Sequence, residues 1–150
     1  MASSNSKAFL LFRNAPRGLN LKWIREYAKR LSITVAAGRG FTVLITIDKE
    51  MRRLNHEFLG KDYPTDVLSF PMEGDVSELG EIAISAQQAR LQAKQFRHSV
   101  EEEIGILMLH GLLHLMGMDH ETDGGKMKRA EKKWRRVLNQ PQGLIERVAK

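Results

Sequence analysis

The stretch SVEEEIGILMLHGLLHLMG, residues 99–117, decides the fold. Ser99 and Glu102 have the spacing of a capping box, in which each side chain hydrogen-bonds the backbone N–H of the other residue at the start of a helix. The apolar residues that follow lie almost all the way round this helix, and a helix of that kind is normally buried in the middle of a domain. Gly117 stands where a left-handed residue commonly ends a helix. We therefore predict a central buried helix that runs to Met116.

The segments on either side alternate between strand and helix patterns. β-branched and aromatic runs predict strands at residues 7–13, 41–47, 67–70 and 80–85. Apolar residues at helical spacing predict further helices at residues 21–31, 48–58, 87–96 and 123–139. Asn20 and Asp48 are the expected caps of the first two helices, and residues 72–80 are expected to form an exposed loop. The order predicts an α+β fold in which helices pack on a small mixed sheet.

Length and composition fit one domain over residues 1–150, with flexible ends at residues 1–6 and 143–150. Of the 150 residues, 42% are apolar and 28% are charged, which is ordinary for a globular protein. The chain has no cysteine, so disulfides and thiolate metal ligands are excluded, and this agrees with a cytoplasmic location. The apolar run near the N-terminus is too short for a signal peptide or a membrane span, so no membrane partner is expected.

Histidines gather at the end of the central helix. His110 and His114 lie four residues apart, which places both side chains on one helix face about 6 Å apart. Gly117 allows the chain to reverse and bring His120 back toward them. Three nitrogen ligands leave one tetrahedral position open, which is typical of a catalytic zinc site. A histidine pair that binds no metal is the alternative, but burying such a pair on an apolar helix would be costly.

The histidine spacing matches that of metzincin peptidases, except that Gly111 occupies the position of their catalytic glutamate. A peptidase mechanism with a base at this position is therefore excluded, although zinc can still lower the pKa of a bound water to about 7. Asp119 is the tentative catalytic residue, because it could orient a histidine ring or accept a proton. Capping of the next turn is an equally good interpretation of Asp119. Glu103 is either a partner of the metal ligands or an ordinary charged residue of the first helical turn.

The chain carries a formal net charge of +6, which favours polyanionic partners such as RNA. The last predicted helix has basic residues on one broad arc, among them Lys128, Arg129 and Lys132. This arc either binds the RNA backbone or is a solvated helix face. The opposite stripe, expected to face the core, consists of Met127, Ala130, Trp134, Val137 and Leu138. No string of residues indicates base-specific reading or a helix that recognises DNA.

Three stretches carry a family resemblance. HGLLHLMGMDH, residues 110–120, resembles the signature HGxLHLxGxDH of the YbeY family of bacterial endoribonucleases. LNHEFLGKDYPTDVLSFP, residues 54–71, resembles the segment before that family's central strand. GEIAIS, residues 80–85, resembles the GDI-type strand, with Glu81 in place of the usual aspartate. The resemblance covers the chain from about Phe41 to Trp134.

The resemblance implies a zinc-dependent endoribonuclease that cleaves single-stranded RNA, with one zinc ion held by His110, His114 and His120. It also implies a part in ribosomal RNA maturation, at the 3′ end of 16S ribosomal RNA, and in ribosome quality control. One departure from the family matters for function, because Leu59 stands where the family usually has an arginine. Lys61 could bind substrate in its place, but as a point charge rather than a planar fork.

Two other functions remain open. A metzincin-like peptidase agrees with the histidine spacing but lacks the glutamate. A ribosome- or RNA-binding factor with a purely structural zinc is the non-enzymatic alternative, although a site with an open position is unusual for a structural ion.

Overall fold

The computed structural model describes residues 8–61, 65–73, 77–119 and 122–145. Strands and helices follow one another in the predicted order, and the α+β fold is confirmed. The strands are β1 (Ala8–Phe12), β2 (Gly40–Thr46), β3 (Val67–Pro71) and β4 (Glu78–Ser85). The helices are α1 (Leu21–Thr34), α2 (Asp48–Leu59), α3 (Ala86–Phe96), α4 (Val100–Leu115) and α5 (Lys126–Val137).

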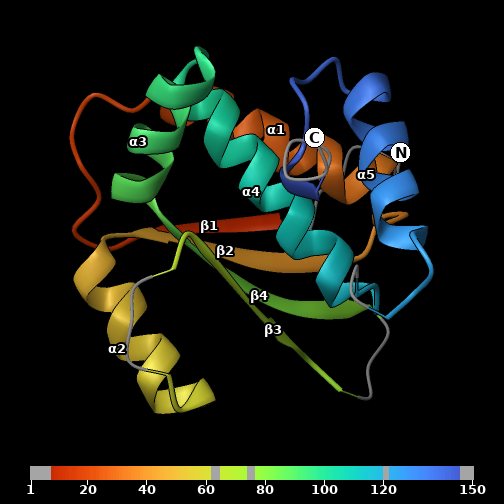
Figure 1. Cartoon of the computed structure of the whole chain (residues 1–150), viewed down its shortest axis with the longest axis horizontal. Coiled ribbons are helices and arrows are strands. Elements are labelled where there is room, and N and C mark those ends of the chain that lie inside the picture. The colour runs from red at the N-terminus through yellow and green to blue at the C-terminus, as the bar shows by residue number, and fades with distance from the viewer. Residues whose placement is uncertain (1–7, 62–64, 74–76, 120–121, 146–150) are drawn as a thin grey trace.

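The four strands form one mixed sheet in the order β1-β2-β4-β3. β1 and β4 both run parallel to β2, whereas β3 pairs with β4 in the antiparallel direction. In Figure 1, α1, α3, α4 and α5 lie on one side of the sheet and α2 lies on the other. The two faces of the sheet are therefore covered very differently.

The central helix α4 begins and ends as the sequence predicts. The Ser99 hydroxyl accepts a hydrogen bond from the Glu102 N–H, and the Glu102 carboxylate accepts one from the Ser99 N–H, both at 3.0 Å. A cap of this kind stabilises a helix by about 1 kcal/mol. The residues from Glu103 to Leu115 are buried, except for the half-buried His114. Gly117 follows with a positive φ of 92°, so the prediction of a left-handed end is confirmed.

We predicted from its position that Asp48 would cap α2, and this prediction is wrong. Ile47 occupies the cap position, and no side chain caps the helix there. The Asp48 carboxylate accepts hydrogen bonds from the Ser85 hydroxyl at 2.6 Å and from the Gln88 amide at 3.0 Å. Asp48 therefore ties the start of α2 to the start of α3, a contact that depends on two segments far apart in the sequence.

Strand β4 is longer than predicted, because residues 78–80 of the expected loop pair with neighbouring strands. Helix α5 is shorter than the predicted span 123–139. Asp123 lies before it, and its carboxylate accepts hydrogen bonds from the backbone N–H groups of Gly125 and Met127. Val137 was expected to face the core with Met127, but it is 54% exposed at the C-terminal end of the helix. Among the described residues, no helix is both long and apolar enough to span a membrane.

The C-terminal segment folds back onto the helices. Leu144 and Ile145 pack against the main hydrophobic core, and Gly143 is buried. The predicted flexible end at residues 143–150 therefore does not begin at residue 143, since residues 143–145 are packed. Residues 1–6 and 146–150, the remainder of the predicted flexible ends, lie outside the described residues.

Candidate metal centre

A pocket of about 710 Å³ lies where the C-terminal end of α4 meets strand β3 and the C-terminal end of α2. His110 and His114 of α4 line it, together with Asp119 from the turn that follows. The pocket is thus formed by the segments that the sequence singled out, and it brings the two helical histidines together with the candidate catalytic aspartate.

The two histidines lie close together, and the protein fixes both rings. Their ring centroids are 4.8 Å apart, with an angle of 77° between the planes. His110 Nδ1 lies 3.1 Å from a carboxylate oxygen of Glu131, and His114 Nδ1 lies 2.9 Å from the backbone carbonyl of Met118. Metal-binding histidines commonly donate one ring N–H to a carboxylate or carbonyl in this way, which directs the other nitrogen toward the ion. A metal ion at this pair would therefore be bound through Nε2 of each ring.

Glu131 is a functional residue that the sequence analysis missed. It lies on α5, it is 1% exposed, and its second carboxylate oxygen accepts a hydrogen bond from the Ile145 N–H at 2.7 Å. A signal was present in the sequence, because Glu131 is the one acidic residue of KMKRAEKKWRRV. It also falls at helical spacing from Met127 and Trp134, on the side that we expected to face the core.

The third expected ligand, His120, lies outside the described residues. Within the described part of the chain, no group of three histidine, aspartate or glutamate side chains is placed to hold a metal. His110 and His114 nevertheless fit a metal, because imidazole suits zinc and both rings are oriented by hydrogen bonds. Asp119 is exposed at the same pocket, and its backbone carbonyl accepts hydrogen bonds from the N–H groups of Thr122 and Asp123.

Gly111 lies against the sheet and has no room for a side chain. A Cβ atom there would lie 2.7 Å from Ile82 Cγ2 and 3.2 Å from the Ser69 hydroxyl oxygen. The Ser69 hydroxyl donates a hydrogen bond to the Gly111 carbonyl at 3.0 Å, which holds β3 against α4. A glutamate at this position would displace β3 and β4, so the packing itself excludes the base of a metzincin peptidase.

Comparison with known proteins identifies the family. The profile of the family described as Endoribonuclease YbeY matches residues 14–141. The chain belongs to the YbeY family. A relative from Solibacter usitatus, named Endoribonuclease YbeY, is 53% identical over 97% of this chain and 98% of its own length. Another relative of that name, from Koribacter versatilis, is 50% identical over 72% of this chain and 70% of its own length.

The fold has a counterpart among solved structures. The solution structure of a protein from Thermotoga maritima is similar to this YbeY-family chain with a TM-score of 0.57 and 28% sequence identity. The similarity covers 83% of this chain and 85% of that chain.

Leu59, where the resemblance to the YbeY family led us to expect an arginine, lies in the candidate metal centre. Leu59, at the end of α2, is 49% exposed and lines the pocket that contains His110 and His114. Lys61 lines the same pocket, so a cation lies close to the position where an arginine was expected. Lys128, Arg129 and Lys132 are exposed on α5 and are not among the described residues that line this pocket.

Glu103 pairs with a histidine outside the candidate metal ligands. It is fully buried, and its carboxylate lies 2.6 Å from Nε2 of His98, which is itself mostly buried. Glu103 is a charged residue of the first turn of α4, as one of the two interpretations had it, and its pairing with His98 was not foreseen. The pair holds the turn between α3 and α4 against the start of α4.

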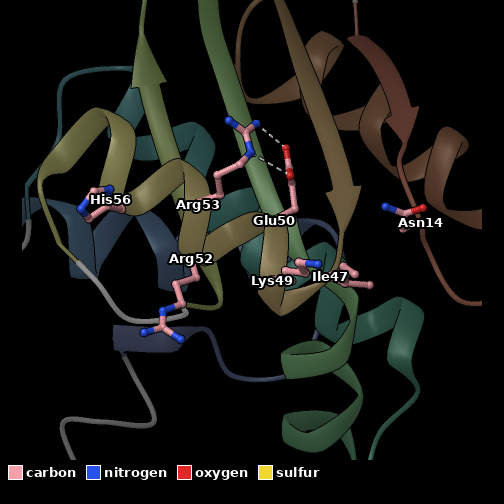
Figure 2. A pocket seen from close by; sticks show the side chains of 7 residues that line it. All are labelled: Asn14, Ile47, Lys49, Glu50, Arg52, Arg53 and His56. Atoms are coloured by element: carbon pink, nitrogen blue, oxygen red, sulfur yellow. Dashed lines mark hydrogen bonds and ion pairs between the residues drawn. The ribbon is translucent and has the colours of Figure 1, made fainter.

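A second hollow, of about 480 Å³, lies along the N-terminal half of α2. Figure 2 shows its charged side chains, with Glu50 and Arg53 hydrogen-bonded to each other at 2.6 Å. The hydrogen bond from Arg53 holds the pKa of Glu50 below its ordinary value, and the charge of Arg13 acts in the same direction. Glu50 is thus already paired with Arg53 and Arg13, and we assign no metal or substrate to this hollow.

Proposed function

We propose that this YbeY-family endoribonuclease cleaves single-stranded RNA with one zinc ion held by His110, His114 and His120. The observation that carries the proposal is the pair of hydrogen bonds at Nδ1 of His110 and His114, which orients two neighbouring imidazole rings beside an open pocket and leaves Nε2 as the nitrogen for a metal. Three nitrogen ligands would leave one position of a tetrahedral ion for water or substrate.

The chain's own residues have separate tasks in this proposal. Zinc in such a site supplies Lewis acidity and a nucleophile at neutral pH. Glu131 and the Met118 carbonyl keep the two rings oriented, so that the ligands need not reorganise when the ion binds. Asp119 lies at the pocket and accepts a proton during cleavage. Lys61, which is exposed beside the pocket, attracts the phosphate that is cut.

Biological substrate and location follow from the family resemblance. We place the cleavage in ribosomal RNA maturation, at the 3′ end of 16S ribosomal RNA, and in ribosome quality control in the cytoplasm. The exposed face of α5 that carries Lys128, Arg129 and Lys132 supports this proposal as an attachment surface for RNA backbone outside the pocket. RNA held there would be retained near the metal centre through electrostatic attraction that weakens as salt is added.

The experiment compares the parent protein with His114→Ala on single-stranded RNA and on casein, each with and without a metal chelator. His56→Ala is the matched control, since His56 is an exposed histidine of α2 that lines the second hollow instead. We expect RNA cleavage that chelation and His114→Ala abolish and that His56→Ala leaves unchanged. Cleavage of casein alone would show a peptidase, and RNA binding without cleavage would show a binding factor.

A further inference from the structure

The face of the sheet opposite α4 carries an unusual row of side chains. Strand register places Phe9 beside Thr42, Thr42 beside Glu81, and Glu81 beside Phe70, so the row crosses all four strands. Phe9 is 60% exposed. An aromatic residue thus stands at each end of the row and polar groups stand between them. The sequence shows no base-recognition motif, because these residues come from four separate segments.

Helix α2 covers only part of this face. Met51 of α2 packs on Leu68 and Ala83, and together they form a small core separate from the main one. Beside this small core lies a groove of about 360 Å³, which we call the sheet groove. It is lined by side chains that include Leu11, Arg13, Thr42, Phe58, Phe70 and Glu81.

Two aromatic rings form one wall of the sheet groove. Phe58 of α2 meets Phe70 of β3 edge to face, with ring centroids 5.6 Å apart. Phe58 is nevertheless 59% exposed, so most of its ring surface faces solvent. Exposed phenylalanine rings on a sheet are the usual platform on which unpaired bases stack, and any base has a flat face to offer.

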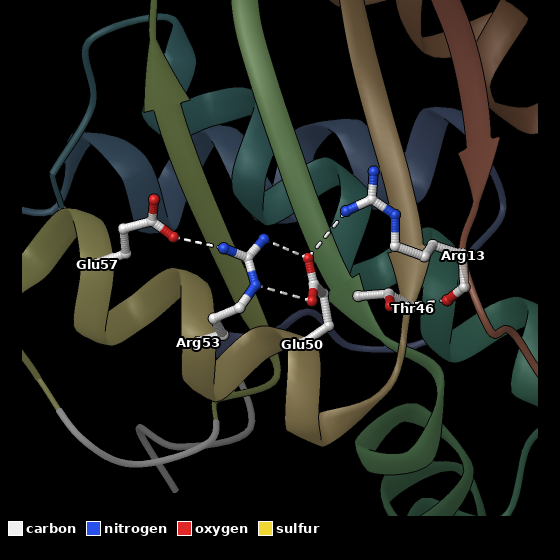
Figure 3. A network of polar contacts seen from close by, with 5 residues as sticks. All are labelled: Arg13, Thr46, Glu50, Arg53 and Glu57. Carbon is white, nitrogen blue, oxygen red and sulfur yellow. Dashed lines mark hydrogen bonds and ion pairs between the residues drawn. The ribbon is translucent and has the colours of Figure 1, made fainter.

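The charged groups of the groove suit a nucleotide as well. Arg13 reaches across the sheet from the end of β1 and hydrogen-bonds Glu50 of α2 at 2.9 Å (Figure 3). Its backbone carbonyl accepts a hydrogen bond from the Thr46 hydroxyl at 2.7 Å, which fixes the position of the chain there. A guanidinium group has five N–H donors, so Arg13 can still bind a phosphate. Glu81 can accept a hydrogen bond from a base amino group and keeps phosphates away from the middle of the sheet.

The sheet groove adjoins the candidate metal centre. Phe58 lines the groove, and the next residue, Leu59, lines the metal pocket. Strand β3 lies between the two sites, since Phe70 faces the groove while its neighbours Ser69 and Pro71, on the opposite face of the sheet, line the metal pocket. Because β3 is an edge strand, a single strand of RNA that leaves the metal pocket reaches the groove by passing round β3 or the C-terminal end of α2.

From these observations we propose that the sheet groove binds an unpaired nucleobase of the single-stranded RNA substrate, at a position flanking the bond that is cut. Phe58 stacks against this base, Phe9 stacks against a second base at the β1 end of the row, and Arg13 binds the adjoining phosphate. The proposal rests on the proposed function, which it extends from the cleavage point to the path of the substrate.

Binding of RNA under conditions that prevent cleavage tests the groove independently of catalysis. A single-stranded RNA of about twelve nucleotides and one of about three, labelled with a fluorophore, are titrated with each protein in the presence of a metal chelator and followed by anisotropy. Phe58→Leu keeps an apolar side chain without the ring, whereas Phe58→Tyr keeps the ring. Leu91→Ala is the control, because Leu91 is 63% exposed on α3, on the other side of the sheet (Figure 1). Circular dichroism and urea unfolding establish that every variant is folded.

We expect Phe58→Leu and Phe9→Ala each to weaken binding of the longer strand by about five-fold or more, the effect of losing one stacked base. Phe58→Tyr should restore the affinity, and Leu91→Ala should not change it. Parental affinity in both Phe58→Leu and Phe9→Ala would overturn the proposal. So would a change in their sedimentation without a change in RNA affinity, which would make the groove an interface between copies. If the parent binds RNA through these rings but does not cleave it, the proposed function fails and the groove stands.

Discussion

Replacement of Glu131 should weaken metal binding, although Glu131 is a partner of the proposed ligand His110 and not itself a proposed ligand. Its carboxylate has two partners, His110 Nδ1 at 3.1 Å and the Ile145 N–H at 2.7 Å, in a position that is 1% exposed. Glu131→Ala removes both acceptors, and a buried donor left without an acceptor costs about 1–3 kcal/mol. Loss of a carboxylate behind a metal-binding histidine commonly lowers metal affinity by about 10- to 100-fold.

The assay is competition for zinc between the protein and a fluorescent chelator, followed by urea unfolding of the metal-free protein. Glu131→Gln is the more informative variant. Its amide has one oxygen in place of two, so it can accept a hydrogen bond from His110 Nδ1 or from the Ile145 N–H but not from both. We expect an affinity loss of about ten-fold for Glu131→Gln and up to about 100-fold for Glu131→Ala. Glu73→Gln, in an exposed loop, is the control and should bind zinc as the parent does. Parental zinc affinity in a folded Glu131→Ala protein would refute this role of Glu131.

Three further predictions follow from individual contacts. Leu59→Arg should raise kcat/KM for RNA by about ten-fold through one charge-assisted contact with phosphate; an unchanged value would mean that Leu59 does not weaken catalysis. Gly111→Ala should lower the free energy of unfolding by about 1–3 kcal/mol, since its Cβ would lie 2.7 Å from Ile82, and urea unfolding would show parental stability if this packing were unimportant. The hydrogen bond from Arg53 lowers the pKa of Glu50 in the folded protein, so this carboxylate stabilises the fold above its unfolded pKa and loses that effect as the pH falls through the folded value. Glu50→Gln should therefore reduce the difference in stability between pH 7 and acid pH, and an unaltered pH profile would contradict the assignment.

Local signals in the sequence were sufficient where the structure depends on neighbouring residues. The capping box of Ser99 and Glu102, the apolar run after it and Gly117 together predicted α4, and the structure confirms all three. The i, i+4 spacing of His110 and His114 likewise predicted two side chains on one helix face. These features need only helix geometry, which a short segment determines by itself.

Contacts between distant segments could not be predicted in the same way. Glu131 meets His110 across α4 and α5, and Asp48 meets Ser85 across α2 and β4. Each pair depends on how helices pack against one another and against the sheet, which no local periodicity encodes. The sequence does show one acidic residue, Glu131, on the inward face of a basic helix. It does not show which residue Glu131 contacts.

The aromatic row on the sheet was invisible for a related reason. Phe9, Phe58 and Phe70 belong to β1, α2 and β3, and each looks like an ordinary core residue within its own segment. Only the strand order β1-β2-β4-β3 and the register between strands show that Phe9 and Phe70 share a face of the sheet that α2 leaves partly open, beside Phe58 of that helix.

A zinc titration of the metal-free protein is the sharpest test of metal-dependent RNA cleavage. Cleavage of a single-stranded RNA is measured as zinc is added, with His114→Ala in parallel. We expect cleavage to be absent without metal, to rise with added zinc and to saturate at one ion per chain, while His114→Ala stays inactive throughout. Full cleavage by the metal-free protein, or by His114→Ala, would contradict the assignment of the histidine pocket as the catalytic centre.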